Sequence, residues 1–202
     1  MRLPRFLTGF AVFAALLAGC TQTIHPPRSP AEPTRVYVAD YGLHSSIFLP
    51  QFGAGGEVCE DGPYVEYAFG DWPFMALGRQ GLGDALSAVW FSPRSALGRR
   101  VARIEDGWFS PGTRSVPERL TGFYAARADV QRFEEGLDER HRSQLHTGII
   151  NPEDDTVFVQ DPEHYWLGHN CNHVTLRWLK KLGCDVRGLL PLSHFRLGTV
   201  RE

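Results

Sequence analysis

The chain has 202 residues, a formal net charge of −2 at neutral pH and 43% hydrophobic residues, which is enough for a folded domain with a buried core. Its 21 lysines and arginines form no basic cluster that would follow a phosphate backbone, so no nucleic-acid partner is expected. No glycine-rich phosphate loop, dinucleotide fingerprint or paired-carboxylate motif is present, and no cofactor is expected.

The first twenty residues have the layout of a secretory signal. Arg2 and Arg5 precede an apolar run, 6–17, that is too short to span a bilayer. The tetrad Leu-Ala-Gly-Cys that ends at Cys20 resembles the lipobox of bacterial lipoproteins, in which the cysteine is acylated and becomes the N-terminus. We therefore expect residues 1–20 to be a lipoprotein signal peptide and the lipid on Cys20 to hold the protein at a membrane. An ordinary cleaved signal and an uncleaved anchor are the alternatives.

The residue after Cys20 is Thr21 rather than aspartate, which by resemblance to Gram-negative lipoproteins indicates sorting to the outer membrane, facing the periplasm. In that oxidising compartment Cys59, Cys171 and Cys184 cannot all pair within the chain. A Cys59–Cys184 bridge is one solution, and the connectivity stays open.

The 182 residues after Cys20 fit one domain. Residues 21–34 contain four prolines and little to bury, so we expect an extended spacer, followed by a single α+β domain over 35–202. The β-branched and aromatic stretch 35–50 predicts one long strand, or two short strands broken at Gly42, with His44 inside the element.

The next elements are predicted from periodicity. Residues 64–72 alternate as a half-buried strand, with Glu66 facing away from Val65 and Tyr67. The segment 82–91 favours a short helix, and 99–109 a strand with a turn at Asp106-Gly107. Residues 117–142 favour one or two helices with Val130, Phe133 and Leu137 on one face, and 156–160 favours a late strand.

The segment that starts at Asn170 is a strong helix prediction. Val174, Trp178 and Leu182 recur every four residues, and a glycine follows. Asn170 is a preferred N-cap residue, so Cys171 falls in the first turn on the buried stripe. The positive end of the helix dipole favours thiolate and so lowers the pKa of such a thiol, which makes Cys171 a candidate nucleophile.

A cysteine nucleophile needs a base and a group that orients the base. His44 lies on an early strand among apolar and small residues, where an imidazole needs partners, and Glu66 on the next strand is the candidate orienter. Asp71, at the end of that strand on its other face, is the rival. The backbone N–H of Cys171 is a candidate oxyanion donor, next to Asn170.

These residues resemble the circularly permuted papain-like group, which includes lecithin retinol acyltransferase-like proteins and permuted relatives of the NlpC peptidases. The residues Asn-Cys-Asn-His-Val at 170–174 look like its Asn-Cys-Glu-His-Phe box. Together with DYGLHSSIFLP and VEYAFGDW, they are more closely similar to an uncharacterised family of bacterial lipoproteins, in which His-Thr-Gly stands where this chain has His-Ser-Ser. The resemblance implies a small antiparallel sheet packed against helices, with Cys171 as nucleophile at the start of a late helix, His44 as base and Glu66 as orienter.

The expected function is therefore a cell-envelope cysteine hydrolase or acyltransferase that acts on an amide or ester, with peptidoglycan peptides or lipid acyl groups as substrates. The alternative is a non-catalytic envelope binding module on the same scaffold, in which Cys171 and His44 are core residues and Glu66 is solvated. A redox thiol pair has no Cys-x-x-Cys motif to support it. A metal site at His169, Cys171 and His173 is disfavoured because helix geometry separates Cys171 from His173.

Overall fold

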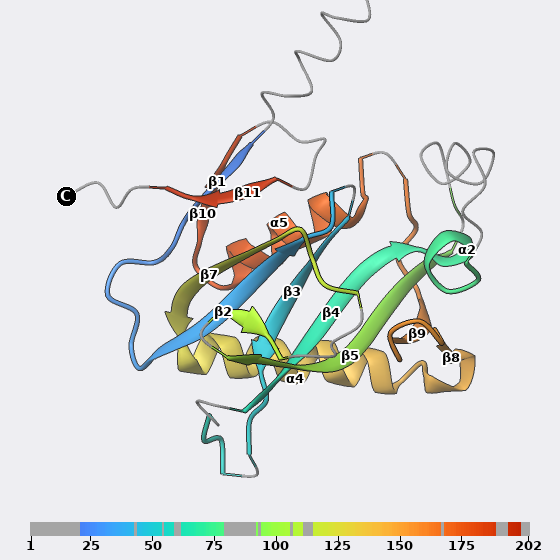
Figure 1. Cartoon of the computed structure of the whole chain (residues 1–202), viewed down its shortest axis with the longest axis horizontal. Helices are drawn as coiled ribbons and strands as arrows, with labels where there is room; N and C mark the ends of the chain where they lie inside the picture. The colour runs from blue at the N-terminus through green and yellow to red at the C-terminus, as the bar shows by residue number, and fades with distance from the viewer. Residues whose placement is uncertain are drawn as a thin grey trace, which may run out of the picture.

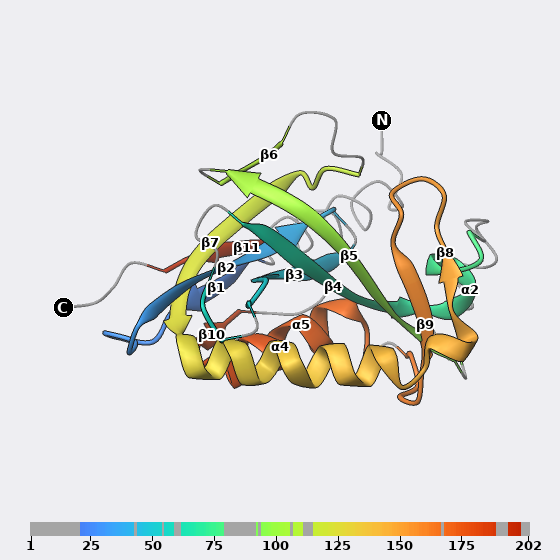
Figure 2. The same ribbon diagram turned by 90° about the horizontal axis from the view of Figure 1, so that it is seen from below.

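The computed structural model describes residues 21–42, 44–53, 55–58, 62–78, 92, 94–105, 107–110, 115–166, 168–188 and 194–198. The fold is α+β: a large antiparallel sheet packs one face on two helices, and a three-stranded sheet lies at one end (Figures 1 and 2). No helix within these ranges is long and apolar enough to cross a membrane. The expected signal peptide, the acylated Cys20 and the expected helix at 82–91 lie outside the described residues.

The large sheet has the strand order β7-β2-β3-β4-β5-β9-β8, and neighbouring strands are antiparallel. A short strand, β6, extends β5 through a turn in which Gly107 has φ +80°. The strands are β2 (Pro33–Asp40), β3 (Ser45–Pro50), β4 (Pro63–Asp71), β5 (Ser95–Glu105), β6 (Trp108–Phe109), β7 (Arg119–Ala126), β8 (Ile149–Ile150) and β9 (Val157–Asp161).

The break predicted at Gly42 is confirmed. Gly42 has φ +85°, in the left-handed region that glycine tolerates best, and the Tyr41 N–H donates to the His44 carbonyl over 2.8 Å. This tight turn joins β2 to β3. His44 is therefore the last residue of a turn rather than a residue inside a strand, and its side chain is not fixed by strand pairing.

Two helices, α4 (Arg127–Arg142) and α5 (Cys171–Lys181), cover one face of the sheet. The predicted stripe of α4 is buried, and the rings of Phe133 on α4 and Trp178 on α5 meet edge-on at 6.2 Å. The α5 prediction is confirmed from its N-cap onward. The other helices in the part of the chain that the structure describes are α2 (Trp72–Met75) and the 3₁₀ helix η1 (Leu145–Thr147). The sheet residues under α4 and α5 include Val36, Val38, Ile47, Leu49, Val65, Tyr67 and Phe69.

The start of the segment 117–142 differs from the helix prediction, because residues 119–126 form β7 and only the remainder is helical. β7 pairs with the whole of β2. Phe123 and Ala125 are buried while Tyr124 between them is exposed, which is the period-2 pattern of a strand. This segment forms a strand because it pairs with β2, whose residues lie 79 to 93 positions earlier in the chain, and local propensity does not contain that information.

Residues 21–34 also differ from the expected free spacer. β1 (Gln22–His25) lies in the middle of the small sheet, antiparallel to β10 (Asp185–Arg187) and parallel to β11 (Phe195–Leu197). Gln22 and Ile24 have no solvent exposure. The fold therefore begins at residue 22 rather than 35, because both partners of β1 come from the far end of the chain.

Ile24→Ala tests whether the N-terminal segment belongs to the fold. The substitution leaves a cavity in the main core, and we expect it to lower the free energy of unfolding by about 3 kcal/mol in denaturant titrations. Thr23→Ala, on the outward face of the same strand, is the control and should cost less than about 1 kcal/mol. Equal and small effects of both substitutions would mean that this segment is a spacer after all.

Candidate functional site

The first turn of α5 is built as the sequence predicted. Asn170 precedes the helix in an extended conformation, and its Oδ1 accepts a hydrogen bond from the His173 backbone N–H at 3.2 Å. The same oxygen lies 2.9 Å from Nδ1 of the His173 ring. Asn170 is therefore a helix cap, and it places Cys171 at the first helical position.

Polar groups converge on the sulfur of Cys171. The Ser45 amide, the amides of the first turn and the hydroxyl of Tyr165 lie within hydrogen-bonding reach of Sγ, and the thiol faces Asn172 Oδ1 at 3.7 Å. Cys171 is only 4% exposed. Burial raises the pKa of the Cys171 thiol, and the donors from Ser45, Asn172 and Tyr165 offset this in part, so the thiol is neutral in this conformation.

A second set of hydrogen bonds ties β3 to α5. The Ser45 hydroxyl donates to Asn172 Oδ1 over 2.8 Å, and the hydroxyls of Ser45 and Thr175 are 3.0 Å apart. All three side chains are buried. This cluster fixes the start of β3, and with it the turn that carries His44, against the N-terminal end of α5, where Cys171 lies.

His44 does not contact Cys171 through a hydrogen bond or ion pair among the described residues. Its side chain stacks loosely near Tyr41, with ring centroids 6.0 Å apart, and its Nε2 is buried without a hydrogen-bond partner there. Burial lowers the pKa of His44 to about 4, so the imidazole is neutral at physiological pH. Because the amide of the next residue, Ser45, interacts with Sγ, the backbone of His44 lies close to the sulfur although its side chain makes no bond to it.

Glu66 faces away from the helices, as predicted, but it does not orient His44. Its carboxylate accepts hydrogen bonds from Tyr41, at 2.7 Å, and from Ser46 and Arg100. Arg100 lies directly opposite Glu66 in the β4–β5 register, and both side chains are buried. Glu66 is therefore half of a buried ion pair, which the sequence analysis missed because the pairing depends on strand register.

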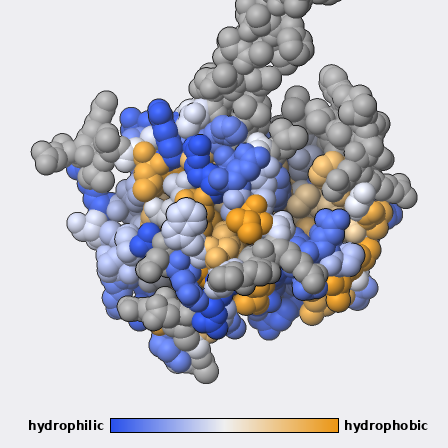
Figure 3. Space-filling view, in the orientation of Figure 1, coloured by the Kyte–Doolittle hydropathy of each residue, from blue (hydrophilic) through white to orange (hydrophobic). Residues whose placement is uncertain are grey.

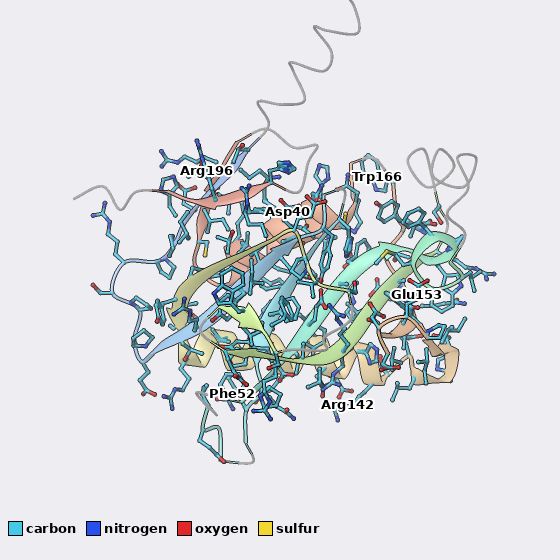
Figure 4. All side chains as sticks on the ribbon, viewed as in Figure 1. Asp40, Phe52, Arg142, Glu153, Trp166 and Arg196 are labelled. Atoms are coloured by element: carbon cyan, nitrogen blue, oxygen red, sulfur yellow. The ribbon has the colours of Figure 1, made fainter. Side chains whose placement is uncertain are left out.

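Arg100 extends this cluster toward the surface. Its guanidinium donates to the Tyr41 hydroxyl at 3.0 Å and to the Ser115 carbonyl at 2.9 Å, and it lies 3.6 Å from the carboxylate of Asp154. These groups line a pocket of about 270 Å³ on the sheet face opposite α5. His44 and Glu153 also line it, and Glu153 marks its position in Figure 4. Cys171 is not part of its wall.

Asp71 lies on the other face, toward α5. Its Oδ2 accepts from the Phe74 N–H at 3.0 Å and caps the short α2, while its Oδ1 is buried without a hydrogen-bond partner among the described residues. Burial, followed by the charges of Cys171 and Asp71, raises the pKa of Tyr165. Asp71, Tyr165 and Cys171 are therefore neighbours, whereas the side chains of Glu66 and His44 line the pocket on the opposite face of the sheet.

Tyr165 is the functional candidate that sequence reasoning missed. Its backbone pairs with Ser92, N to O in both directions, at 2.8 and 3.2 Å. This bridge holds the segment before α5 so that the phenol reaches the sulfur. The only sequence signal was an aromatic residue shortly before the Asn-Cys pair, which by itself does not distinguish a site residue from a core residue.

The remaining histidines near α5 have separate partners. His169 Nε2 is 2.7 Å from Glu163, and His173 bonds to Asn170. Among the described residues no group of three or more His, Cys, Asp or Glu side chains is placed to hold a metal ion.

Cys171 and Cys184 are both buried, and no disulfide joins either of them to another cysteine of the described residues. Burial raises the pKa of Cys184 to about 12. Cys59, the other half of the Cys59–Cys184 bridge considered above, lies outside the described residues.

Comparison with family models, curated proteins and solved structures found no match to this chain.

Glu66→Ala should destabilise the protein strongly, because it leaves the buried guanidinium of Arg100 without a counter-charge. We expect a loss of about 3–5 kcal/mol in the free energy of unfolding, measured by denaturant titration. Glu66→Ala/Arg100→Ala should lose less than the sum of the two single substitutions. Asp185→Ala, which breaks an exposed ion pair with Arg187, is the control, with an expected cost below about 1 kcal/mol. A similarly small loss for Glu66→Ala would show a solvated carboxylate.

His44 should make the fold sensitive to acid. The unfolded chain binds a proton at this residue below about pH 6.5 and the folded chain only near pH 4, so stability is fully present above pH 6.5 and falls as the pH drops toward 4. His44→Gln should remove about 3 kcal/mol of this dependence, measured as the difference from wild type in unfolding free energy across that window. Parallel profiles for wild type and His44→Gln would contradict the burial of the imidazole.

Proposed function

We propose that the protein is a cell-envelope cysteine hydrolase or acyltransferase, with Cys171 as the nucleophile and His44 as the general base. One observation carries the proposal: Cys171 Sγ sits at the start of α5 against the Ser45 amide and the Tyr165 hydroxyl, and the residue before Ser45 is a histidine with an unpaired, buried ring nitrogen. This combination supports acyl transfer better than a purely structural role.

The chemistry follows from the protonation states. A neutral His44 imidazole accepts the proton of the Cys171 thiol, and the thiolate attacks the carbonyl carbon of an amide or ester. In the proposed step, the Cys171 amide and the Tyr165 hydroxyl donate to the developing oxyanion. The imidazolium then gives its proton to the leaving amine or alcohol, and an acyl-thioester remains until water, or a second alcohol or amine, takes the acyl group.

The proposed step needs the His44 side chain to turn toward α5. Nothing in the hydrogen bonding of the described residues opposes this, because its Nε2 has no partner to lose. The residue belongs to a tight turn and not to a strand, so a change of side-chain rotamer leaves the sheet intact. Formation of the thiolate–imidazolium pair offsets the burial that otherwise keeps the thiol neutral.

For the third member we favour Asp71 over Glu66. The acceptor sites of Glu66 are occupied by Arg100, Tyr41 and Ser46. Asp71 has a free buried oxygen on the helix side of the sheet, beside Tyr165. We assign Glu66 to the structure of the pocket wall, through its ion pair with Arg100, and Asp71 to the polar groups that surround the proposed nucleophile.

The α+β arrangement, with the candidate nucleophile at the start of a late helix, supports the permuted papain-like assignment within this proposal. The expected acyl chains on Cys20 place the enzyme in the cell envelope, at the outer membrane facing the periplasm. Peptidoglycan peptides and lipid acyl groups are the two substrate classes that this location and chemistry favour.

A non-catalytic binding module is the second candidate, and a specific observation favours it. Cys171 is 4% exposed, its thiol pKa is raised, and the pocket on the opposite sheet face does not include it. On this account the pocket binds a ligand, and the cysteine fills the core beneath α5.

The pH dependence of iodoacetamide labelling at Cys171 separates the two functions. Iodoacetamide reacts with the conformation in which the Cys171 thiol is accessible. In that conformation we expect the pKa of the Cys171 thiol to lie below about 8.5, because His44 pairs with the thiolate. His44→Ala should raise that pKa by more than about one unit and slow labelling at neutral pH at least about tenfold. Labelling is read by mass spectrometry, so that Cys59 and Cys184 are followed separately.

Two control variants sharpen the result. His146→Ala removes an exposed imidazole on η1, outside the site around Cys171, and should leave the labelling pKa of Cys171 unchanged. Asp71→Asn should alter the labelling pKa of Cys171, whereas Glu66→Gln should leave it unchanged. Slow labelling with a pKa above 8.5, unchanged by His44→Ala, would exclude the enzyme and leave the binding module.

A further inference from the structure

The outward face of the small sheet carries a row of basic side chains. β1 lies between β10 and β11, and the register places Thr23 opposite Arg187 on one side and opposite Arg196 on the other. Ile24 and Phe195, on the opposite face, are buried in the core. The strand alternation that buries the apolar residues therefore puts both arginines on the outside.

These charges are only partly compensated. Arg196 Nε donates to the Thr23 hydroxyl at 3.2 Å, and none of the ion pairs among the described residues includes Arg196. Arg187 Nε bonds to Asp185 at 2.7 Å. Both arginines line a hollow of about 710 Å³ with Arg28, so three arginines and one aspartate give it a formal excess of two positive charges. Figure 3 shows hydrophilic side chains gathered over this end of the molecule, where Figure 4 labels Arg196.

The position of this surface relative to a membrane follows from the fold. Only one residue separates the expected acylated Cys20 from β1, which begins at Gln22. Two residues of extended chain span at most about 7 Å. Because residues 22–25 belong to a sheet and are not part of a free spacer, the lipid anchor would hold the small sheet at the depth of the lipid headgroups.

We propose that this face, formed by Arg28, Arg187 and Arg196, binds the phosphates of anionic phospholipids and so fixes the orientation of the domain on the bilayer. Guanidinium groups match phosphate oxygens through paired hydrogen bonds, and the hollow is wide enough for headgroups. The proposal takes the position of the bilayer from the expected acylation of Cys20. It does not depend on Cys171 or on any catalytic activity.

The test uses the chain from Thr21 onward, which contains every helix and strand that the structure describes, without the lipid. Its co-flotation is measured with phosphatidylcholine vesicles that contain or lack phosphatidylglycerol. We expect binding that requires phosphatidylglycerol and weakens as salt rises. Arg187→Gln/Arg196→Gln should weaken it at least about tenfold.

The matched control is Arg132→Gln/Arg142→Gln, which removes two exposed arginines of α4. Arg142 lies on the far side of the molecule from Arg196 (Figure 4). The control should bind the vesicles as well as wild type does. An equal loss of binding in both double variants would overturn the proposal, as would binding that is the same with and without phosphatidylglycerol. A further test is whether inorganic phosphate releases the protein from the vesicles more strongly than sodium chloride at equal ionic strength does. That result would overturn the proposal as well, because the hollow would then be a site for a soluble anion.

Discussion

The contact between Ser45 and the first turn of α5 holds the candidate site together. The Ser45 side chain bonds to Asn172 and lies against Thr175, while its amide reaches the Cys171 sulfur. The three side chains are buried, so no water competes for these hydrogen bonds and their geometry is fixed. The turn that carries His44 is thereby placed within reach of the nucleophile, whatever rotamer the imidazole adopts.

The sheet separates two kinds of chemistry. On the α5 side, hydrogen-bond donors and one free carboxylate oxygen, from Asp71, surround a neutral thiol. On the other side, the Glu66–Arg100 ion pair and Asp154 form the wall of a small pocket. His44 borders the pocket while its backbone adjoins the thiol side. A ligand in the pocket would therefore contact the same histidine that the proposed reaction needs.

The N-terminal strand bears on the proposed attachment of the protein to the cell envelope. A free spacer would let the domain tumble away from its anchor, whereas β1 is part of the fold and has buried residues on its inner face. With the proposed acylation of Cys20, the arginines on the outer face of the same small sheet would lie in the headgroup region together with the anchor. The orientation of the domain on the bilayer would then follow from the fold itself.

Local pattern alone determined α5, its Asn170 cap and the burial of Cys171, because helix periodicity and capping act over a few residues. The break at Gly42 and the face of Glu66 were predictable for the same reason. Tertiary structure alone decided the strands β1 and β7, the pairing of Glu66 with Arg100 and the contact of Tyr165 with the sulfur. Each of these depends on strand register or on partners far away in the chain, and no local propensity encodes which distant residues will be neighbours.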